Sequence, residues 1–295
     1  MLDVDALAKI RPLELRAKVV VDGFWSGIHR SPLHGFSVEF SEYRAYAPGD
    51  DPRHIDWHAF ARTDKHYIKK YEDETNLRCQ LLVDHSRSMG YASPGAAMTK
   101  GEYAATVAAT LAYFLRGQGD AVGLTTFSTD IEDYLPPKST PGHLRRLMHV
   151  LEKPPAGIAT SLGEPLRRAA ELGRKRGLFV LVSDLLAPLD ELEARLSFLR
   201  ARRHQVAVIQ ILDPREIDFD FPASAQFQDL ESGRHLFVDL RASKADYLRK
   251  SRAHRESLRA LCGARGIAYH LAPTDEPPEL VLRKFIRAEA SEVPA

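Results

Sequence analysis

The stretch Leu178-Phe179-Val180-Leu181-Val182 decides the fold, because these five apolar residues are followed at once by Ser183-Asp184. A short apolar run with polar residues at its end is typical of a strand that is buried on both faces of a sheet. A second strand is predicted from Leu77 to Val83, and it ends at Asp84. Two core strands that each lead into an aspartate predict a sheet with carboxylates gathered at one edge.

Strand and helix patterns alternate from about residue 77 onward. Further strands are predicted at 121–127, 131–135, 206–212 and 267–271, with the 131–135 strand ending before Pro136-Pro137. Helices are predicted at 101–115, 142–151, 162–172, 189–203 and 242–262. This alternation predicts an α/β fold with a doubly wound, mostly parallel sheet that is covered on both faces. In such sheets, ligands bind at the carboxyl ends of the strands.

Two segments break the alternation. Residues 225–240 contain two strand patterns around Glu231-Ser232-Gly233, which predicts a β-hairpin inserted in the wound domain. Residues 1–75 are rich in His, Arg, Tyr and Asp, and their apolar positions are scattered. They predict an accessory subdomain packed on the core, with a short helix at 51–61. The α/β domain itself is predicted to span residues 76–290.

The composition is that of a globular protein without a strongly charged surface. Of 295 residues, 44% are hydrophobic and 27% charged, and the formal net charge is +1. This balance argues against binding nucleic acid or an anionic membrane through bulk charge. Two cysteines, Cys79 and Cys262, are too few for a disulfide framework or a cysteine zinc site. The pattern shows neither a secretory leader nor a run of about 18 apolar residues, so we expect a soluble cytoplasmic protein.

Oxygen-bearing side chains follow the predicted strands. Asp84, Ser86 and Ser88 occupy alternate positions after the first core strand, so their oxygens can converge above the sheet. One carboxylate and two hydroxyls suit Mg²⁺, Mn²⁺ or Ca²⁺ better than Zn²⁺. Thr160, in a glycine-containing loop, and Asp184 add two further donors. We predict a divalent-metal site of these five residues, although Asp, Ser and Thr are also common helix caps.

The order Asp-x-Ser-x-Ser, Gly-x-x-Thr and Ser-Asp resembles the metal-ion-dependent adhesion site of von Willebrand factor A domains. The resemblance implies a von Willebrand A-like, Rossmann-type fold. It also implies that the bound ion is Mg²⁺ before Mn²⁺ or Ca²⁺. It also implies that Ser86, Ser88 and Thr160 bind the ion directly or nearly so, while Asp84 and Asp184 act largely through bound water. Two carboxylates neutralise a divalent ion, which can then accept an Asp or Glu carboxylate from a protein partner.

A second signature lies near the N-terminus and reads Glu39-Phe40-Ser41-Glu42-Tyr43-Arg44-Ala45-Tyr46-Ala47-Pro48-Gly49-Asp50-Asp51-Pro52-Arg53-His54-Ile55-Asp56-Trp57. It resembles the hallmark of a bacterial family known only as domain of unknown function 58, in which this segment precedes a von Willebrand A-like domain. The resemblance continues through Ala61-Arg62 and covers nearly the whole chain. It implies a MoxR-type AAA+ ATPase as partner. Many members of the family also carry two membrane helices, which this sequence does not show.

Six charged residues and one tryptophan of this signature allow two interpretations. The residues concerned are Arg44, Asp50, Asp51, Arg53, Asp56, Trp57 and Arg62. The simpler interpretation is a salt-bridged clasp that fixes the subdomain to the core; the alternative is a binding surface for the partner or for a phosphate. His54 and His58 have metal-ligand spacing on the predicted helix but lack a third ligand, so we expect a surface or hydrogen-bonding pair.

Sequence signatures of common catalytic sites are absent. The sequence contains no P-loop, no dinucleotide-binding glycine pattern and no nucleophile elbow. It therefore favours a non-enzymatic, metal-dependent protein-interaction module that acts with a MoxR-type ATPase in chaperone-like assembly or maturation of other proteins. Two alternatives stay open. One is a metal-assisted hydrolase with His85 as the local base, and the other is a nucleic-acid-binding protein that uses Arg167, Arg168 and the basic residues 174–176.

Overall fold

The computed structural model describes residues 3–29, 43–45, 67–69, 77–140, 142–155, 157, 162–173, 175–221, 224–228 and 235–291. The chain divides into two compact units, one formed by Met1–Gly27 with Leu77–Ala295 and the other by Ile28–Asn76. In the smaller unit the structure describes an antiparallel pair, β1 (Tyr43–Ala45) with β2 (Tyr67–Lys69). The helix predicted at 51–61 lies outside the described residues.

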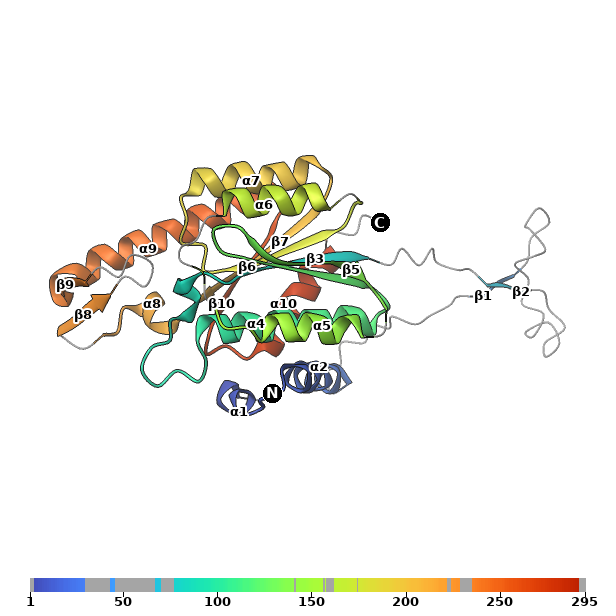
Figure 1. Ribbon diagram of the computed structural model, residues 1–295, viewed down its shortest axis with the longest axis horizontal. Helices are drawn as coiled ribbons and strands as arrows, with labels where there is room; N and C mark the ends of the chain where they lie inside the picture. The colour runs from blue at the N-terminus through green and yellow to red at the C-terminus, as the bar shows by residue number, and fades with distance from the viewer. Residues whose placement is uncertain are drawn as a thin grey trace. The chain divides into compact units, whose positions relative to one another are not determined.

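A six-stranded sheet forms the centre of the larger unit, in the order β10-β7-β6-β3-β4-β5 (Figure 1). Its strands are β3 (Arg78–Asp84), β4 (Ala121–Phe127), β5 (Ile131–Lys138), β6 (Leu178–Ser183), β7 (Gln205–Leu212) and β10 (Ala268–Pro273). Neighbours pair in parallel except at one edge, where β5 is antiparallel to β4. Strands β4 and β6 are buried along their whole length. The predicted α/β fold with a mostly parallel, doubly covered sheet is confirmed.

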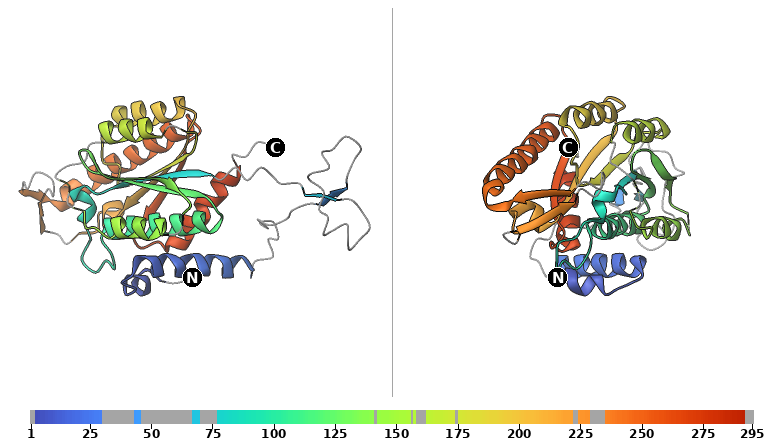
Figure 2. Two further views of the ribbon diagram at one scale, coloured as in Figure 1. Left: turned by 45° about the vertical axis from the view of Figure 1, so that its right-hand side comes forward. Right: turned by 60° about the vertical axis from the view of Figure 1, so that its left-hand side comes forward.

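Helices cover both faces of this sheet (Figures 1 and 2). One face carries α6 (Gly163–Leu172), α7 (Leu189–Ala201) and α9 (Leu240–Gly263), and the other carries α4 (Lys100–Gly117), α5 (His143–Leu151) and α10 (Pro278–Ser291). Because side chains alternate along a strand, β3 serves both layers. Leu82 belongs to the buried cluster that includes Leu166 of α6 and Leu196 of α7, whereas Leu81 and Val83 are buried on the opposite face.

The edge strand β5 is longer than predicted. The expected strand ends before Pro136-Pro137, yet β5 continues through both prolines to Lys138. Proline has no N–H to donate to a ladder, but an edge strand needs donors on one side only. The β4–β5 register also shifts between Val122 and Leu124, close to this point. The predicted hairpin is present as β8 (Ser224–Gln228) paired antiparallel with β9 (His235–Asp239).

Two helices near the N-terminus belong to the larger unit, although the sequence prediction assigns residues 1–75 to an accessory subdomain. They are α1 (Val4–Ala8) and α2 (Leu13–His29). The buried residues of α2 recur at helical spacing and are Leu13, Ala17, Val20, Val21 and Phe24. Phe24 and Trp25 contact Phe114 of α4, with ring centroids 5.8 and 5.7 Å away. The sequence prediction missed the helical periodicity of α2. It also includes no helix at residues 278–291, where the structure has α10. Packing of the remaining N-terminal residues on the core stays a prediction.

We expect Phe24→Ala to lower the free energy of unfolding by about 3 kcal/mol, because the truncation leaves a cavity between α2 and α4. Phe24 is 4% exposed, whereas Leu15 on the same helix is 49% exposed. Leu15→Ala is therefore a matched control, with a change of about 0.5 kcal/mol or less. Urea unfolding followed by circular dichroism measures both variants. Equal effects of the two substitutions would show that α2 is not part of the core.

Candidate functional site

The carboxyl ends of β3 and β6 lie side by side, because the two strands are parallel neighbours. Asp84 ends β3 and Asp184 follows β6, and the two residues are 0% and 1% exposed. The Ser183 hydroxyl donates to Asp84 Oδ2 at 2.6 Å, and the Ser86 N–H donates to Asp84 Oδ1 at 2.8 Å. These two hydrogen bonds fix the Asp84 carboxylate at the edge of the sheet.

Ser88 connects the loop after Asp84 to the end of β6. The chain turns there into a short 3-10 helix, η2 (Arg87–Gly90), for which Ser86 is the N-cap. The Ser86 and Ser88 hydroxyl oxygens are 3.0 Å apart, and Ser88 Oγ donates to Asp184 Oδ2 at 2.9 Å. Four of the five predicted metal-site residues thus lie in one group. The fifth, Thr160, lies outside the described residues.

Gly157, which opens the Gly-x-x-Thr sequence, is held tightly against this group. Its N–H donates to the His85 carbonyl at 3.1 Å, and it forms an isolated parallel bridge with Ser86. A Cβ at this position would lie 2.2 Å from Ser128 Cβ. A larger residue would therefore collide with Ser128, which accounts for glycine at this position.

A buried lysine, which no sequence pattern indicates, completes the group. Lys100 Nζ lies 2.9 Å from Asp184 Oδ2 and 2.8 Å from Glu216 Oε1, and the lysine side chain is 1% exposed. Lys100 is the first residue of α4, and Glu216 belongs to the short helix α8 (Pro214–Asp218). Burial by itself would lower the pKa of Lys100, but the two carboxylates together raise that pKa above its usual value. The ammonium group is therefore charged.

The group carries an excess of negative charge. Its ionisable members are three carboxylates (Asp84, Asp184 and Glu216) and one ammonium, which gives a formal charge of −2 when all are ionised. Burial, and after it the charge of Asp184, raises the pKa of Asp84 to about 7. A divalent cation would balance this charge, and the oxygen donors suit a hard ion. The described residues include no group of three or more His, Cys, Asp or Glu side chains able to hold a metal, so such an ion would depend on the serine hydroxyls.

The main chain at Asp184 is held by a hydrogen bond from β7 and turns sharply at the next residue. Gln210 Nε2 donates to the Asp184 carbonyl at 2.8 Å, and the Tyr269 hydroxyl donates to Gln210 Oε1 at 2.6 Å. Leu185 has a φ of 56°, a left-handed conformation that costs a leucine about 1 kcal/mol or more. The next side chain, Leu186, is 61% exposed. The turn thus places an apolar side chain in solvent two residues from the carboxylate.

A cavity of about 260 Å³ adjoins the group on the side of α9. Its lining includes Leu186, Gln210, Leu212, Glu216, Tyr247 and Arg255. Glu216 is common to this cavity and to the ion pair with Lys100. A pocket therefore lies directly beside one carboxylate of this group, that of Glu216.

Of the seven residues singled out in the N-terminal signature, Arg44 alone lies within the described part of the chain. Arg44 is placed in β1, opposite Ile68 of β2. The others are Asp50, Asp51, Arg53, Asp56, Trp57 and Arg62, together with His54 and His58. Both interpretations of that signature, the clasp and the binding surface, stay predictions.

The residues named for the two alternative functions have contacts of their own. His85 is 3% exposed, and its Nδ1 lies 3.8 Å from Glu132 Oε2 on β5. Burial lowers the pKa of His85. In the basic region, Arg167 forms ion pairs with both Glu164 and Glu171, and Arg168 pairs with Asp130 at 2.6 Å. Two of the cations named for nucleic-acid binding, Arg167 and Arg168, are thus paired with carboxylates.

Fold and site together define an α/β protein with a candidate ligand site at the carboxyl edge of its sheet. The chain belongs to the family described as "Protein of unknown function DUF58", whose model matches residues 42–257. It is 30% identical over 270 residues to an uncharacterized protein of Mycobacterium bovis and, equally, to one of Mycobacterium tuberculosis, with 89% of this chain and 84% of each relative covered.

Among solved structures, the chain is similar to the conserved hypothetical protein BatB from Bacteroides thetaiotaomicron. The TM-score is 0.46 at 15% identity, with 72% of this chain and 99% of that chain covered. Within the described residues, none of the helices has the length and apolar character that crossing a membrane requires.

We expect Lys100→Met to lower the free energy of unfolding by about 3–5 kcal/mol, because it leaves the buried Asp184 and the partly buried Glu216 without a counter-charge. Lys153 is the matched control, since its ion pair with Asp133 at 2.7 Å leaves the lysine side chain 47% exposed. Lys153→Met should change the same quantity by about 1 kcal/mol or less. Chemical denaturation measures both, and a small effect of Lys100→Met would contradict the ion pair described above.

Proposed function

We propose that this chain is a non-enzymatic, metal-dependent protein-interaction module with a von Willebrand A-like adhesion site. In this proposal it acts with a MoxR-type AAA+ ATPase in chaperone-like assembly or maturation of other proteins. The observation that carries the proposal is the continuous group of oxygens formed by Ser86, Ser88 and Asp184, with Asp84 fixed next to it. Parallel strands bring these residues together at the edge where α/β proteins bind ligands.

The residues present fit a divalent cation. Ser86 and Ser88 would hold it directly or nearly so, Asp84 and Asp184 would act largely through bound water, and Thr160 is the predicted fifth member. All five offer oxygen, the donor that Mg²⁺ prefers. With all of its groups ionised, the group has the charge of −2 that neutralises the ion. When bound, the ion would supply an open coordination position for an Asp or Glu carboxylate of a protein partner. Neutral hydroxyl ligands would leave the ion strongly attractive to that carboxylate.

The surface beside the group supports a protein as the partner. Leu186 is exposed next to the cavity of about 260 Å³, and an apolar side chain close to the partner's acidic residue would fill this space. Burial of one such side chain contributes about 1.5–3 kcal/mol to binding. The choice of a MoxR-type ATPase follows from the N-terminal signature and from membership of the family, not from this surface.

We expect Mg²⁺ to raise the Tm of the wild-type chain and to have much less effect on Ser88→Ala. An ion that binds the folded state alone stabilises it by about 2.7 kcal/mol at 100 times its Kd. Ser26→Ala is the control, because Ser26 lies on the exposed side of α2 and donates to the Asp22 carbonyl. Differential scanning fluorimetry across an Mg²⁺ series measures all three proteins. An equal response of Ser88→Ala and the wild type would exclude this group as the metal site.

The partnership is tested by pull-down from native lysate with wild type and Ser88→Ala, each with and without Mg²⁺. We expect an AAA+ ATPase to be recovered only by the wild type and only with Mg²⁺. Asp84→Ala should behave like Ser88→Ala if it folds. Equal recovery in all four conditions would overturn the metal mechanism, and failure to recover any AAA+ ATPase would overturn the partnership.

A further inference from the structure

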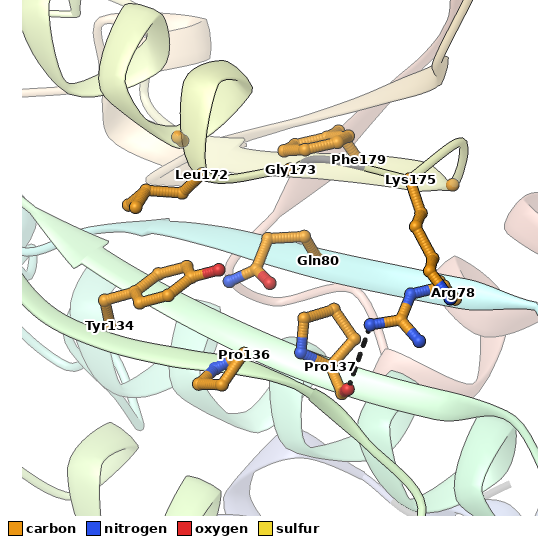
Figure 3. A pocket seen from close by; sticks show the side chains of 11 residues that line it. Arg78, Gln80, Tyr134, Pro136, Pro137, Leu172, Gly173, Lys175 and Phe179 are labelled. Carbon is orange, nitrogen blue, oxygen red and sulfur yellow. Dashed lines mark hydrogen bonds between the residues drawn. The ribbon is translucent and has the colours of Figure 1, made fainter.

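A second cavity, of about 230 Å³, lies toward the opposite end of β3 from Asp84 (Figure 3). Arg78, the first residue of β3, and Gln80 line it from the sheet. Tyr134 and the prolines of β5 form one wall, and the end of α6 with the start of β6 forms the other. No residue of the proposed metal group lines this cavity.

Two glycines set the shape of the wall that follows α6. A Cβ at Gly177 would lie 2.3 Å from the Arg78 carbonyl oxygen, and a Cβ at Gly173 would lie 2.7 Å from Phe179 Cζ. Both positions therefore hold the chain closer to the sheet than another residue would allow without a shift of its neighbours. The cavity is therefore bounded at Gly177 by a close contact with the backbone of β3, and at Gly173 by a close contact with the Phe179 ring.

Two cations share the cavity. Arg78 and Lys175 both line it, and the Lys175 side chain extends toward Arg78 (Figure 3). Arg78 Nη2 donates to the Pro137 carbonyl at 3.4 Å, a long hydrogen bond to a neutral group. Within the described residues, neither cation forms an ion pair with an Asp or Glu. Two like charges in one small space repel each other, and an anion between them would replace repulsion with attraction.

The remaining walls are largely apolar. Leu172 and Phe179 lie on the side of α6 and β6, and Pro136 and the ring of Tyr134 lie on the side of β5 (Figure 3). Leu172 is 44% exposed at this opening. Burial raises the pKa of Tyr134 while the charge of Arg78 opposes the rise, so the phenol and the guanidinium lie within electrostatic reach of each other. Apolar surface therefore directly adjoins the cation pair.

The size of the cavity limits what it can hold. A volume of about 230 Å³ equals roughly seven or eight water molecules at about 30 Å³ each. Pockets for drug-sized ligands are larger, at about 300–1,000 Å³. The space suits one apolar group of the size of a leucine or phenylalanine side chain together with one carboxylate.

We propose that this cavity binds a small monocarboxylic acid that carries a single aromatic or branched apolar group. The carboxylate is held between Arg78 and Lys175, and the apolar group packs against Leu172 and Phe179. A guanidinium and an ammonium together recognise a carboxylate through charge-assisted hydrogen bonds. This binding site is independent of the proposed metal-dependent function, because the two sites have no residue in common.

The test uses 3-phenylpropionate as the probe and the full chain as the receptor. Two-dimensional NMR of the Gln80 side-chain amide and the Gly177 N–H follows the titration. We expect saturable binding at millimolar concentration or below, which Lys175→Gln and Arg78→Gln each weaken about tenfold or more by removing one charge-assisted hydrogen bond. Arg176→Gln is the matched control, because Arg176 is exposed in the same loop and is not among the lining residues. The neutral alcohol 3-phenylpropan-1-ol should bind at least about tenfold more weakly than the acid.

Three results would overturn the proposal: no saturable binding, equal affinity for the acid and the alcohol, or unchanged affinity in Lys175→Gln. Because Lys175 is exposed, that variant keeps its fold even where Arg78→Gln does not. A short peptide that ends in phenylalanine with a free carboxylate is the competing occupant. If the peptide binds and 3-phenylpropionate does not, the occupant is a polypeptide C-terminus and the small-acid proposal is wrong.

Discussion

The arrangement at the carboxyl edge of the sheet depends on one buried ammonium group. Lys100 joins the start of α4 to the residue after β6 and to α8, through Asp184 and Glu216. Moving a charge out of water costs several kcal/mol, and only partners of opposite charge offset that cost. The cost of burying Lys100 and Asp184, both 1% exposed, is offset by their mutual attraction and by Glu216, which is 19% exposed. Three elements that are distant along the chain are thereby held in one relative position.

The same ammonium group limits how a cation would be bound in the proposed function. Asp184 Oδ2 accepts hydrogen bonds from both Ser88 and Lys100, while Oδ1 accepts a long bond of 3.4 Å from the Leu186 N–H. One oxygen of this carboxylate is thus already engaged, and Asp84 is engaged by Ser183 and Ser86. Asp184 Oδ1, with its single long hydrogen bond, and the remaining lone pairs of the uncharged serine hydroxyls are the oxygens most open to an ion. An ion bound chiefly by neutral groups would keep most of its charge for a ligand from another protein.

Local patterns in the sequence were sufficient to predict those parts of the site whose positions follow from the direction of the strands. The apolar run of β6 and the strand β3 predict that Asp84 and Asp184 meet, because parallel neighbours end at the same edge. Lys100 and Glu216 are 116 residues apart in sequence, and each lies in the first turn of a helix, where charged residues usually face solvent. Their burial results from tertiary packing, so no local pattern reveals it. The apolar periodicity of α2, in contrast, is present in the sequence and could have been predicted.

The sequence of the edge strand β5 limits how a strand from another chain can pair with this sheet. Unpaired N–H and C=O groups at a strand edge normally invite a strand from another chain to extend the sheet. Pro136 and Pro137 lie in succession within β5, and neither can donate a hydrogen bond. An incoming strand would find no continuous ladder to join on this side. The two prolines therefore oppose edge-to-edge aggregation, because one of two successive positions faces the outer side of the edge strand and lacks its N–H.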